Sequence, residues 1–446
     1  MPPLLDLVKL ILDTLVQGLL GWLEEPGMLY FPIMITLVLA MVLRQHVRQA
    51  QLEEHLFGSP LSKPLRQVII SLAFGLLGGF FASLLMISLG VALSEQMGII
   101  YVWPVVLVLM LISPRFMCFA YGGGVVGVAS LLLRGLALLW PELASFGLVA
   151  SLMAVDLSAL MALVGLLHLT EALLIFVSGH INASPVIVQG PKGDVVGGFM
   201  LQRFWPMPMA AFLAVVASQE LEIIGDSIAM PNWWPLLQPF AELGPGMMLF
   251  FYTLPIVAAL GYSDIAISST PRAKSRWSAR NLLLYSIVLL ALAILSGRWT
   301  GMQVLAVLFA PLGHEYLIQA GNRREWAGDP LFTAPERGVR LLTVLPKSAA
   351  QAQGLAGGWI ILNVNGIDVN SRRDLSAALN TFPGLAEIEA VSPEGATRTV
   401  LIHQSQGKLG LVPVPDKSER GSYVKLGGQG FLARMWERIK KKQSGA

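Results

Sequence analysis

The stretch from Gly338 to Gly366, GVRLLTVLPKSAAQAQGLAGGWIILNVNG, is the first long part of the chain that cannot be a membrane helix. Residues 339–345 form an extended apolar run, and a short helical piece after them ends at Gly354. Residues 360–364 then have the composition of a buried strand. Asn365-Gly366 supplies two residues that tolerate a positive φ, as a tight hairpin turn requires. The stretch therefore predicts a strand, a short helix, a second strand and a hairpin.

The chain beyond this hairpin continues the alternation of short elements. Ser371 can cap a helix that has Asp374 in its first turn, and Leu375 and Leu379 lie one turn apart on its inner face. Two strands are predicted after it, 386–390 and 397–402. We expect residues 335–415 to form one small α+β domain.

The composition of the whole chain predicts a polytopic α-helical membrane protein. Of its 446 residues 54% are hydrophobic and 13% are charged, whereas soluble proteins carry roughly 25% charged residues. The net charge of +3 is too small to indicate a nucleic-acid partner. Cys118 is the single cysteine, so an intrachain disulfide is excluded.

Nine apolar runs upstream of this domain are long enough to cross a bilayer, or nearly so. They are 27–43, 67–93, 98–112, 117–139, 148–177, 205–221, 246–267, 281–296 and 299–317. Alternate loops between these runs hold eleven Lys and Arg residues, and the other loops hold one or two. Because basic residues stay on the cytoplasmic side, this asymmetry predicts a cytoplasmic C-terminal domain. A count of eight or ten spans is also open.

The remaining segments complete a division into five parts. Residues 1–26 carry polar side chains at helical spacing, which is typical of an amphipathic helix lying at the membrane interface. Residues 27–320 form the multi-span membrane domain and 321–334 a polar linker. After the α+β domain, residues 416–446 form a flexible basic tail. Its end is either an amphipathic helix attracted to anionic lipid or a solvated terminus.

The order strand, short helix, Gly-Leu, strand and Asn-Gly resembles the bacterial PDZ domain. The resemblance implies that a peptide C-terminus adds as a strand beside a domain strand and lies against a helix, here 371–380. It places the carboxylate-binding loop at Lys408–Leu411. The peptide-binding residues implied are Lys408, Leu409, Gly410, Leu411, Leu375 and Leu379. Pro413 and Trp359 depart from the family pattern, and a domain whose groove is closed is the alternative.

Three apolar stretches extend the resemblance upstream. They are Ile99–Trp103, Ser113–Tyr121 and Glu171–Pro208, the last containing Ser178-Gly179-His180 and Gly197-Gly198-Phe199. In these stretches the chain resembles the MinJ-type topological determinants of Firmicute cell division. That resemblance implies a multi-span membrane region joined to a cytoplasmic PDZ domain, without a catalytic site or cofactor. It also implies a bridge between the polar protein DivIVA and the division inhibitors MinC and MinD.

PDZ domains also accompany membrane proteases, so protease motifs were sought. A zinc protease needs two histidines one helical turn apart with a glutamate between them. His314-Glu315 has the first histidine and the glutamate, but Ile318 occupies the second ligand position. A rhomboid-type serine site requires a glycine two residues before the serine, and Ser178 lacks it. We therefore expect neither an enzyme nor a metal site, with a regulatory protease as the runner-up function.

Asp156, His168, Glu171 and His180 form the most polar group within the membrane runs. Such groups are costly in a bilayer and often mark function. One interpretation is an ion path in a transporter, and the other, which we favour, is hydrogen bonding between packed helices. The function predicted from the sequence is a membrane scaffold whose PDZ domain recruits or positions partners in bacterial division-site selection.

Overall fold

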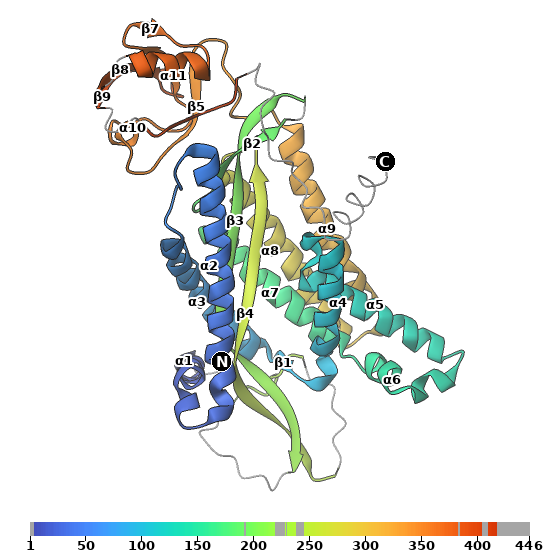
Figure 1. Ribbon diagram of the computed structural model, residues 1–446. Coiled ribbons are helices and arrows are strands. Elements are labelled where there is room, and N and C mark those ends of the chain that lie inside the picture. The colour runs from blue at the N-terminus through green and yellow to red at the C-terminus, as the bar shows by residue number, and fades with distance from the viewer. Residues whose placement is uncertain are drawn as a thin grey trace, which may run out of the picture.

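The computed structural model describes residues 4–190, 193–218, 228, 230–237, 245–381, 384–403 and 409–416. Figure 1 shows a bundle of long helices, a long β-hairpin running along the bundle, and a small α+β domain at one end. The predicted tail after residue 416 and Lys408 lie outside the described residues.

Seven helices in the described ranges are long and apolar enough to cross a membrane. They are α2 (Tyr30–Phe57), α3 (Pro64–Leu89), α4 (Ile99–Ile112) with the turn before it, α5 (Phe119–Ala137), α7 (Leu157–Ser178), α8 (Pro271–Ser296) and α9 (Thr300–Ala327). Helix α7 lies at the centre of the bundle, because its side chains are buried on nearly all sides. The prediction of a polytopic helical membrane protein is confirmed at this level.

Two of the nine predicted spans are strands, so that part of the prediction is wrong. Residues 205–218 of the first run lie in β3 (Val195–Ser218), and residues 247–266 of the second run form β4 (Met247–Ala266). These strands pair antiparallel without interruption from Phe199–Ala266 to Ser218–Met247. Open strands are tolerated at membrane depth only where protein covers them. Helices around the hairpin cover much of β3 in this way, whereas most of β4 is exposed or half-buried.

The free edge of β3 is covered by α3, and the sequence explains how. Pro206 and Pro208 have no backbone N–H to satisfy on that edge, and the Ala210 amide donates to Ser83 Oγ at 2.8 Å. A Cβ atom at Gly79 of α3 would lie 2.0 Å from the Pro208 carbonyl oxygen. The helix backbone therefore rests directly on the strand backbone, which only glycine permits at this distance.

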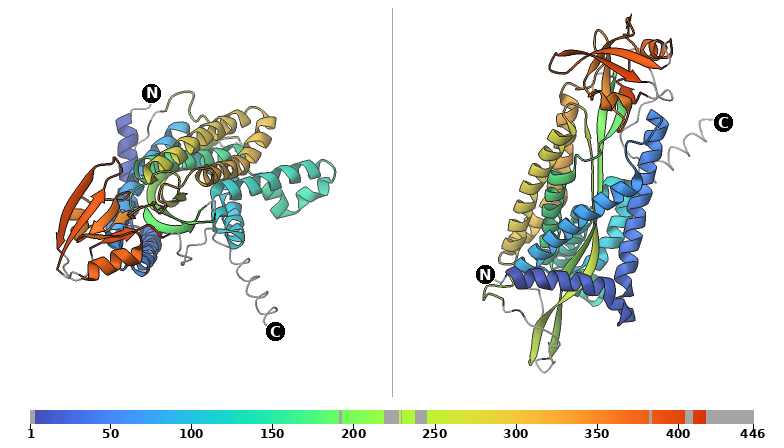
Figure 2. Two further views of the ribbon diagram at one scale, coloured as in Figure 1. Left: turned by 90° about the horizontal axis from the view of Figure 1, so that it is seen from above. Right: turned by 90° about the vertical axis from the view of Figure 1, so that its left-hand side faces the viewer.

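The shorter elements of the membrane part lie around this core. They are α1 (Leu4–Leu20), α6 (Gly147–Met153), β1 (Ala92–Leu93) and β2 (Ser184–Gln189). Strand β2 pairs antiparallel with the first part of β3, and β1 pairs parallel with Phe212 and Leu213. Helix α1 lies across the end of the bundle farthest from the α+β domain (Figure 2). One face of α1 packs on protein, since Leu7 and Ile11 are fully buried; its place in the bilayer interface stays a prediction.

Helix α9 continues to Ala327, into the segment 321–334 that was predicted to be a linker. The polar residue Glu325 on this last turn is buried. Its carboxylate accepts hydrogen bonds from the amides of Ile267 and Ser268 and from the hydroxyl groups of Ser268 and Ser269. These bonds satisfy the backbone between β4 and α8, which explains why a charged residue extends the helix rather than ending it.

The α+β domain contains the elements predicted from its sequence and adds a short strand, β10 (Leu411–Pro413). The predicted elements are β5 (Val339–Val344), α10 (Ala349–Ala352), β6 (Ile360–Val364) with its hairpin partner β7 (Ile367–Asp368), α11 (Arg372–Thr381), β8 (Leu385–Val391) and β9 (Thr397–His403). The sheet has the order β10-β5-β6-β8-β9, with β7 beside β6. Asn365 and Gly366 both have a positive φ, as the hairpin turn between β6 and β7 requires.

This domain is held against the membrane part by a hydrophobic contact. Leu342, Leu345, Val412 and Val414 of the domain pack with Phe57, Leu61, Phe199 and Phe332. Phe57 and Leu61 lie at the junction of α2 and α3, and Phe199 lies in β3. Phe332, just before the domain, forms an isolated backbone bridge with Gly197. The two parts of the chain thus share one buried interface.

Candidate functional site

The residues predicted to bind a peptide lie together in the α+β domain, mostly inside its core. Leu375 and Leu409 are buried in that core, and Leu379 and Leu411 are half-buried against it. Buried leucines stabilise the domain and have little surface left for a ligand. The structure therefore brings four predicted residues together as packing partners.

Gly410 has φ +79°, so its presence in the predicted loop has a conformational reason. A Cβ at this position would also lie 2.2 Å from Cβ of Ser348. Its carbonyl accepts from the Leu345 amide, and the Leu409 carbonyl accepts from the Ala350 amide. Leu409 and Gly410 belong to no helix or strand. Among the described residues, neither of their amides donates a hydrogen bond to a backbone carbonyl. Backbone N–H groups in such a turn are the donors that a carboxylate-binding loop needs.

Strand β10 forms one edge of the sheet and pairs only with β5 among the described strands. The chain leaving β10 turns toward α11, because the Asp416 carboxylate accepts from the Arg372 amide at 3.0 Å. Pro413 within β10 coincides with a shift of register against β5. The edge strand and the start of α11 are thus adjacent, as peptide addition beside a helix would require.

The polar group predicted within the membrane runs is divided by the structure. Asp156 caps the first turn of α7 and accepts from the Ala159 amide, whereas His180 follows the other end of that helix. Burial and the nearby guanidinium groups of Arg272 and Arg276 lower the pKa of His180. Because 22 residues of helix separate these two ends by about 33 Å, the four residues are not one site.

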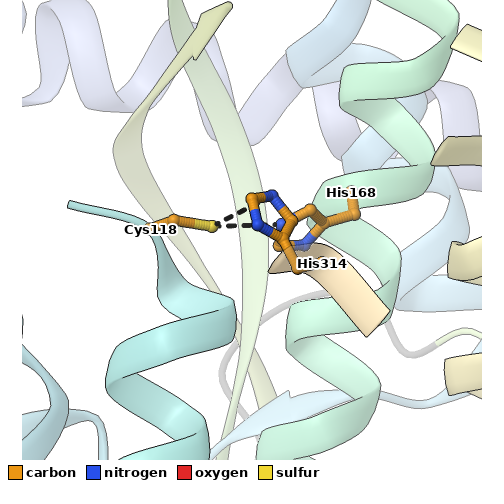
Figure 3. A group of neighbouring side chains, drawn as sticks. All are labelled: Cys118, His168 and His314. Carbon is orange, nitrogen blue, oxygen red and sulfur yellow. Dashed lines mark hydrogen bonds between the residues drawn. The ribbon is translucent and has the colours of Figure 1, made fainter. Parts of the chain in front are cut away.

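The middle of α7 contributes to a different cluster. His168 Nε2 lies 3.2 Å from Cys118 Sγ, and His314 Nε2 lies 3.8 Å from the same sulfur. Cys118 precedes α5, His168 lies in α7 and His314 lies in α9. Figure 3 shows the three side chains directed toward one another, with the cysteine sulfur facing both rings. Their ligand-type atoms all lie within 4.8 Å of one another.

Aromatic and polar side chains surround this cluster. The Tyr285 ring meets both imidazole rings edge-on, and its hydroxyl donates to the Ala310 carbonyl at 2.7 Å. Toward the surface, Glu315 accepts from Tyr121 Oη at 2.6 Å and pairs with Arg115 at 3.5 Å. The carboxylate of the His314-Glu315 motif is therefore engaged by a tyrosine and an arginine.

Glycines in α5 bring the three helices close enough for the cluster to form. A Cβ at Gly124 would lie 2.7 Å from the Pro311 ring of α9, and one at Gly127 would lie 2.8 Å from Val307. A Cβ at Gly123 would lie 3.3 Å from Met161 and Val164 of α7. Small residues at helix interfaces allow this close approach of backbones in membranes.

The cluster follows no linear sequence motif, because its members come from three elements. The protease motif pairs His314 with position 318 on the same helix, whereas the second histidine comes from α7. The signal in the sequence was the scarcity of such groups: two histidines and the single cysteine lie inside apolar runs. Ser178, the candidate of the other protease motif, is fully buried and accepts from Trp205 Nε1, so its hydroxyl serves the packing of α7 on β3.

Comparison with known proteins gives relatives of one kind, and no family model matches the chain. The chain is similar to the cell division topological determinant MinJ of Bacillus subtilis, with 26% identity over 64% of this chain and 64% of that protein. It is also 26% identical to probable cell division topological determinants MinJ of Lacticaseibacillus paracasei and Lacticaseibacillus casei, over 60% of this chain and 71% of theirs. The resemblance to MinJ-type topological determinants expected from the sequence is confirmed.

Proposed function

We propose that this relative of the MinJ-type cell division topological determinants is a membrane platform that positions partner proteins during selection of the division site. The observation that supports the proposal is that the α+β domain packs against the membrane part. Seven membrane-length helices hold a folded α+β domain at one end of the bundle, through a hydrophobic contact that includes Leu342 and Phe199. A domain fixed in this way presents the rest of its surface at a defined position on the membrane.

The proposed orientation places the α+β domain in the cytoplasm. The junction of α2 and α3, which contacts the domain through Leu61, is flanked by Arg48, Lys63 and Arg66. The start of α8, at the same end of the bundle in Figure 1, carries Arg272, Lys274, Arg276 and Arg280. This concentration of basic residues supports a cytoplasmic location.

Recruitment is proposed to follow the PDZ manner of peptide addition. The edge of β10 that pairs with no described strand supplies backbone groups for an added strand next to the docking contact of Val412, and α11 begins beside it. The amides of Leu409 and Gly410 are the proposed donors to the peptide carboxylate. Lys408, which precedes them in the sequence, adds a positive charge.

The partners proposed are the polar protein DivIVA and the inhibitor MinD of the same cell. The similarity to MinJ proteins supports a role in division-site selection, and the resemblance stated from the sequence supplies these two names. A bridge between them needs two contacts on the cytoplasmic side. The peptide edge of the α+β domain is proposed as one of the contacts.

The test uses the full chain in lipid nanodiscs, because the α+β domain shares a buried interface with the membrane part. Purified DivIVA and MinD are titrated against wild type, Lys408→Glu and the control Arg398→Glu. Arg398 lies exposed on β9, at the opposite edge of the sheet from β10. We expect one partner to bind wild type and the control equally, and Lys408→Glu to bind more weakly, with the larger loss at low salt.

Two results would contradict the proposal at different levels. Equal binding by Lys408→Glu and Arg398→Glu would reject the peptide loop while leaving the platform in place. Failure of both partners to bind, together with correct septum placement in cells lacking the gene, would reject the platform itself.

A further inference from the structure

We propose that Cys118, His168 and His314 bind a transition-metal ion in the membrane part, with Zn²⁺ as the preferred ion. A thiolate and two imidazoles are ligands of zinc in proteins. The three come from the start of α5, the middle of α7 and the middle of α9. An ion held between them would tie together three helices that are far apart in the sequence.

The separations between the ligand atoms suit such an ion. With zinc bonds of about 2.3 Å to sulfur and about 2.0–2.1 Å to nitrogen, neighbouring ligand atoms of a tetrahedral site lie about 3.3–3.6 Å apart. The sulfur lies 3.2 Å from His168 Nε2 and 3.8 Å from His314 Nε2. Both values lie within a few tenths of an ångström of that range. The two imidazole nitrogens lie within 4.8 Å of each other, so side-chain rotations that bring the rings together would complete the three bonds.

His168 is already oriented as a metal ligand. Its Nδ1 lies 2.7 Å from the Val164 carbonyl oxygen, which can only accept a hydrogen bond. The proton of the neutral ring is therefore on Nδ1, and the lone pair of Nε2 faces Cys118. Metal-binding histidines usually donate their second nitrogen to a carbonyl or carboxylate in this way, which fixes the tautomer and the ring.

His314 presents the complementary feature. Its Nδ1 is buried and has no hydrogen-bond partner in the part of the chain that the structure describes. The nitrogen placed to bind the ion is the other one, Nε2, which faces Cys118; Nδ1 is left without the second-nitrogen partner that His168 has. Packing between the Tyr121 and Tyr285 rings keeps the imidazole next to His168 while leaving its nitrogens available.

The charge of the occupied site can be balanced locally. Binding of Zn²⁺ to Cys118 displaces the thiol proton to solvent and gives a complex of net charge +1 with two neutral imidazoles. Glu171 follows His168 by one turn on the same face of α7 and is near enough to interact electrostatically with Cys118. Its carboxylate, as a neighbouring anion outside the three-residue cluster, would bring the net charge to zero, which a membrane interior favours.

The single cysteine makes the test direct. Alkylation of the full chain in detergent reports on Cys118 Sγ alone, because the chain has no other thiol. After treatment with a chelator, we expect Zn²⁺ to slow alkylation about tenfold, because the bound thiolate is no longer free to react, and Mg²⁺ to have no effect. This measurement uses wild type, so it does not depend on whether a variant folds.

Metal content then identifies the ligands. Wild type should retain one equivalent of zinc after desalting, and His314→Gln and Cys118→Ser should retain much less. His46→Gln is the matched control, since His46 is also a buried histidine but bonds to Ser71 away from the cluster. The control should retain zinc and the protection of Cys118.

The proposal is overturned if Zn²⁺ leaves the alkylation of wild type unchanged. It is equally overturned if His314→Gln and His46→Gln retain the same amount of zinc. Either result, with no protection by any other transition-metal ion, would mean that the cluster is a thiol–imidazole hydrogen bond within helix packing. Protection by cuprous ion but not by Zn²⁺ would reject zinc as the preferred ion.

Discussion

The two sheets of this molecule differ in how readily their sequences can be interpreted. In the α+β domain, β8 alternates buried Ala386, Ile388 and Ala390 with Glu387 and Glu389, which are not buried. In the membrane part, β3 is buried continuously from Trp205 to Ala211, because α3 and other elements cover it. A period of two is visible only where one face meets water. The hairpin strands therefore have the composition of membrane helices.

The positions of the prolines indicate strands in two apolar runs whose composition suggests helices. Pro206 and Pro208 stand two residues apart near the start of one apolar run, 205–221, and Pro255 stands within the other. A helix interior loses a hydrogen bond at each proline, whereas a strand accepts proline where its N–H faces away from the paired strand. Two prolines at that spacing therefore favour a strand with one covered edge, as the structure shows.

The largest effect is expected where α3 rests on β3. Gly79→Val would place its Cβ 2.0 Å from the Pro208 carbonyl oxygen, an atom that cannot rotate away. We expect a loss of about 3 kcal/mol or more in unfolding free energy, at the upper end of overpacking costs. Thermal unfolding of the purified full chain measures it, and expression yield should fall in parallel.

Gly135→Val is the matched control for this change. Gly135 lies in α5 of the same bundle, and no atom lies within 4 Å of a Cβ built there. The control should unfold close to the wild-type temperature. Equal unfolding temperatures for the two variants would show that β3 does not lie against α3, and the contrast between the two sheets would then fail.

A second prediction tests the contact between the two parts. Leu342 is fully buried against Phe199 and Phe332 and lies outside the domain's own core. Leu342→Ala should cost about 2–3 kcal/mol, as large-to-small changes at buried sites do. The domain should loosen from the membrane part while β8 stays protected. Hydrogen exchange of the full chain, compared between β5 and β8, measures the difference.

Leu401→Ala serves as its control, since Leu401 in β9 is 55% exposed. That change should alter exchange in neither strand. If Leu342→Ala exposes β8 as much as β5, the domain does not fold independently of its docking contact. The two sheets would then belong to one cooperative unit rather than two.

The sequence predicts the α+β domain more accurately than the membrane part. The boundaries of β6, α11, β8 and β9 were predicted within about two residues, because Asn365-Gly366, Ser371 and the alternating face are local signals. The number of helical spans was not, because a covered strand and a membrane helix share one composition. The Cys118–His168–His314 cluster could not be predicted, because it depends on the packing of α5, α7 and α9. The burial of Leu375 and Leu409 likewise follows from the closure of the domain around them.

The smallest predicted effect concerns the exposed start of α11. This is the helix start that Ser371 and Asp374 predicted from the sequence. Hydrogen bonds from the Ser371 hydroxyl and the Asn370 amide hold the pKa of Asp374 below its usual value of 3.8. A carboxyl whose pKa is lower in the folded state stabilises that state above the unfolded pKa, and this contribution is lost as pH falls through the folded pKa.

Amide protection in the first turn of α11, corrected for intrinsic exchange, should therefore be the same at pH 7 and pH 5 and should decline below about pH 4. Asp374→Asn should start lower and lose this decline, with β8 as the internal reference. A decline of equal size in Asp374→Asn would assign the pH dependence to another group and remove the capping carboxylate from the account of this helix.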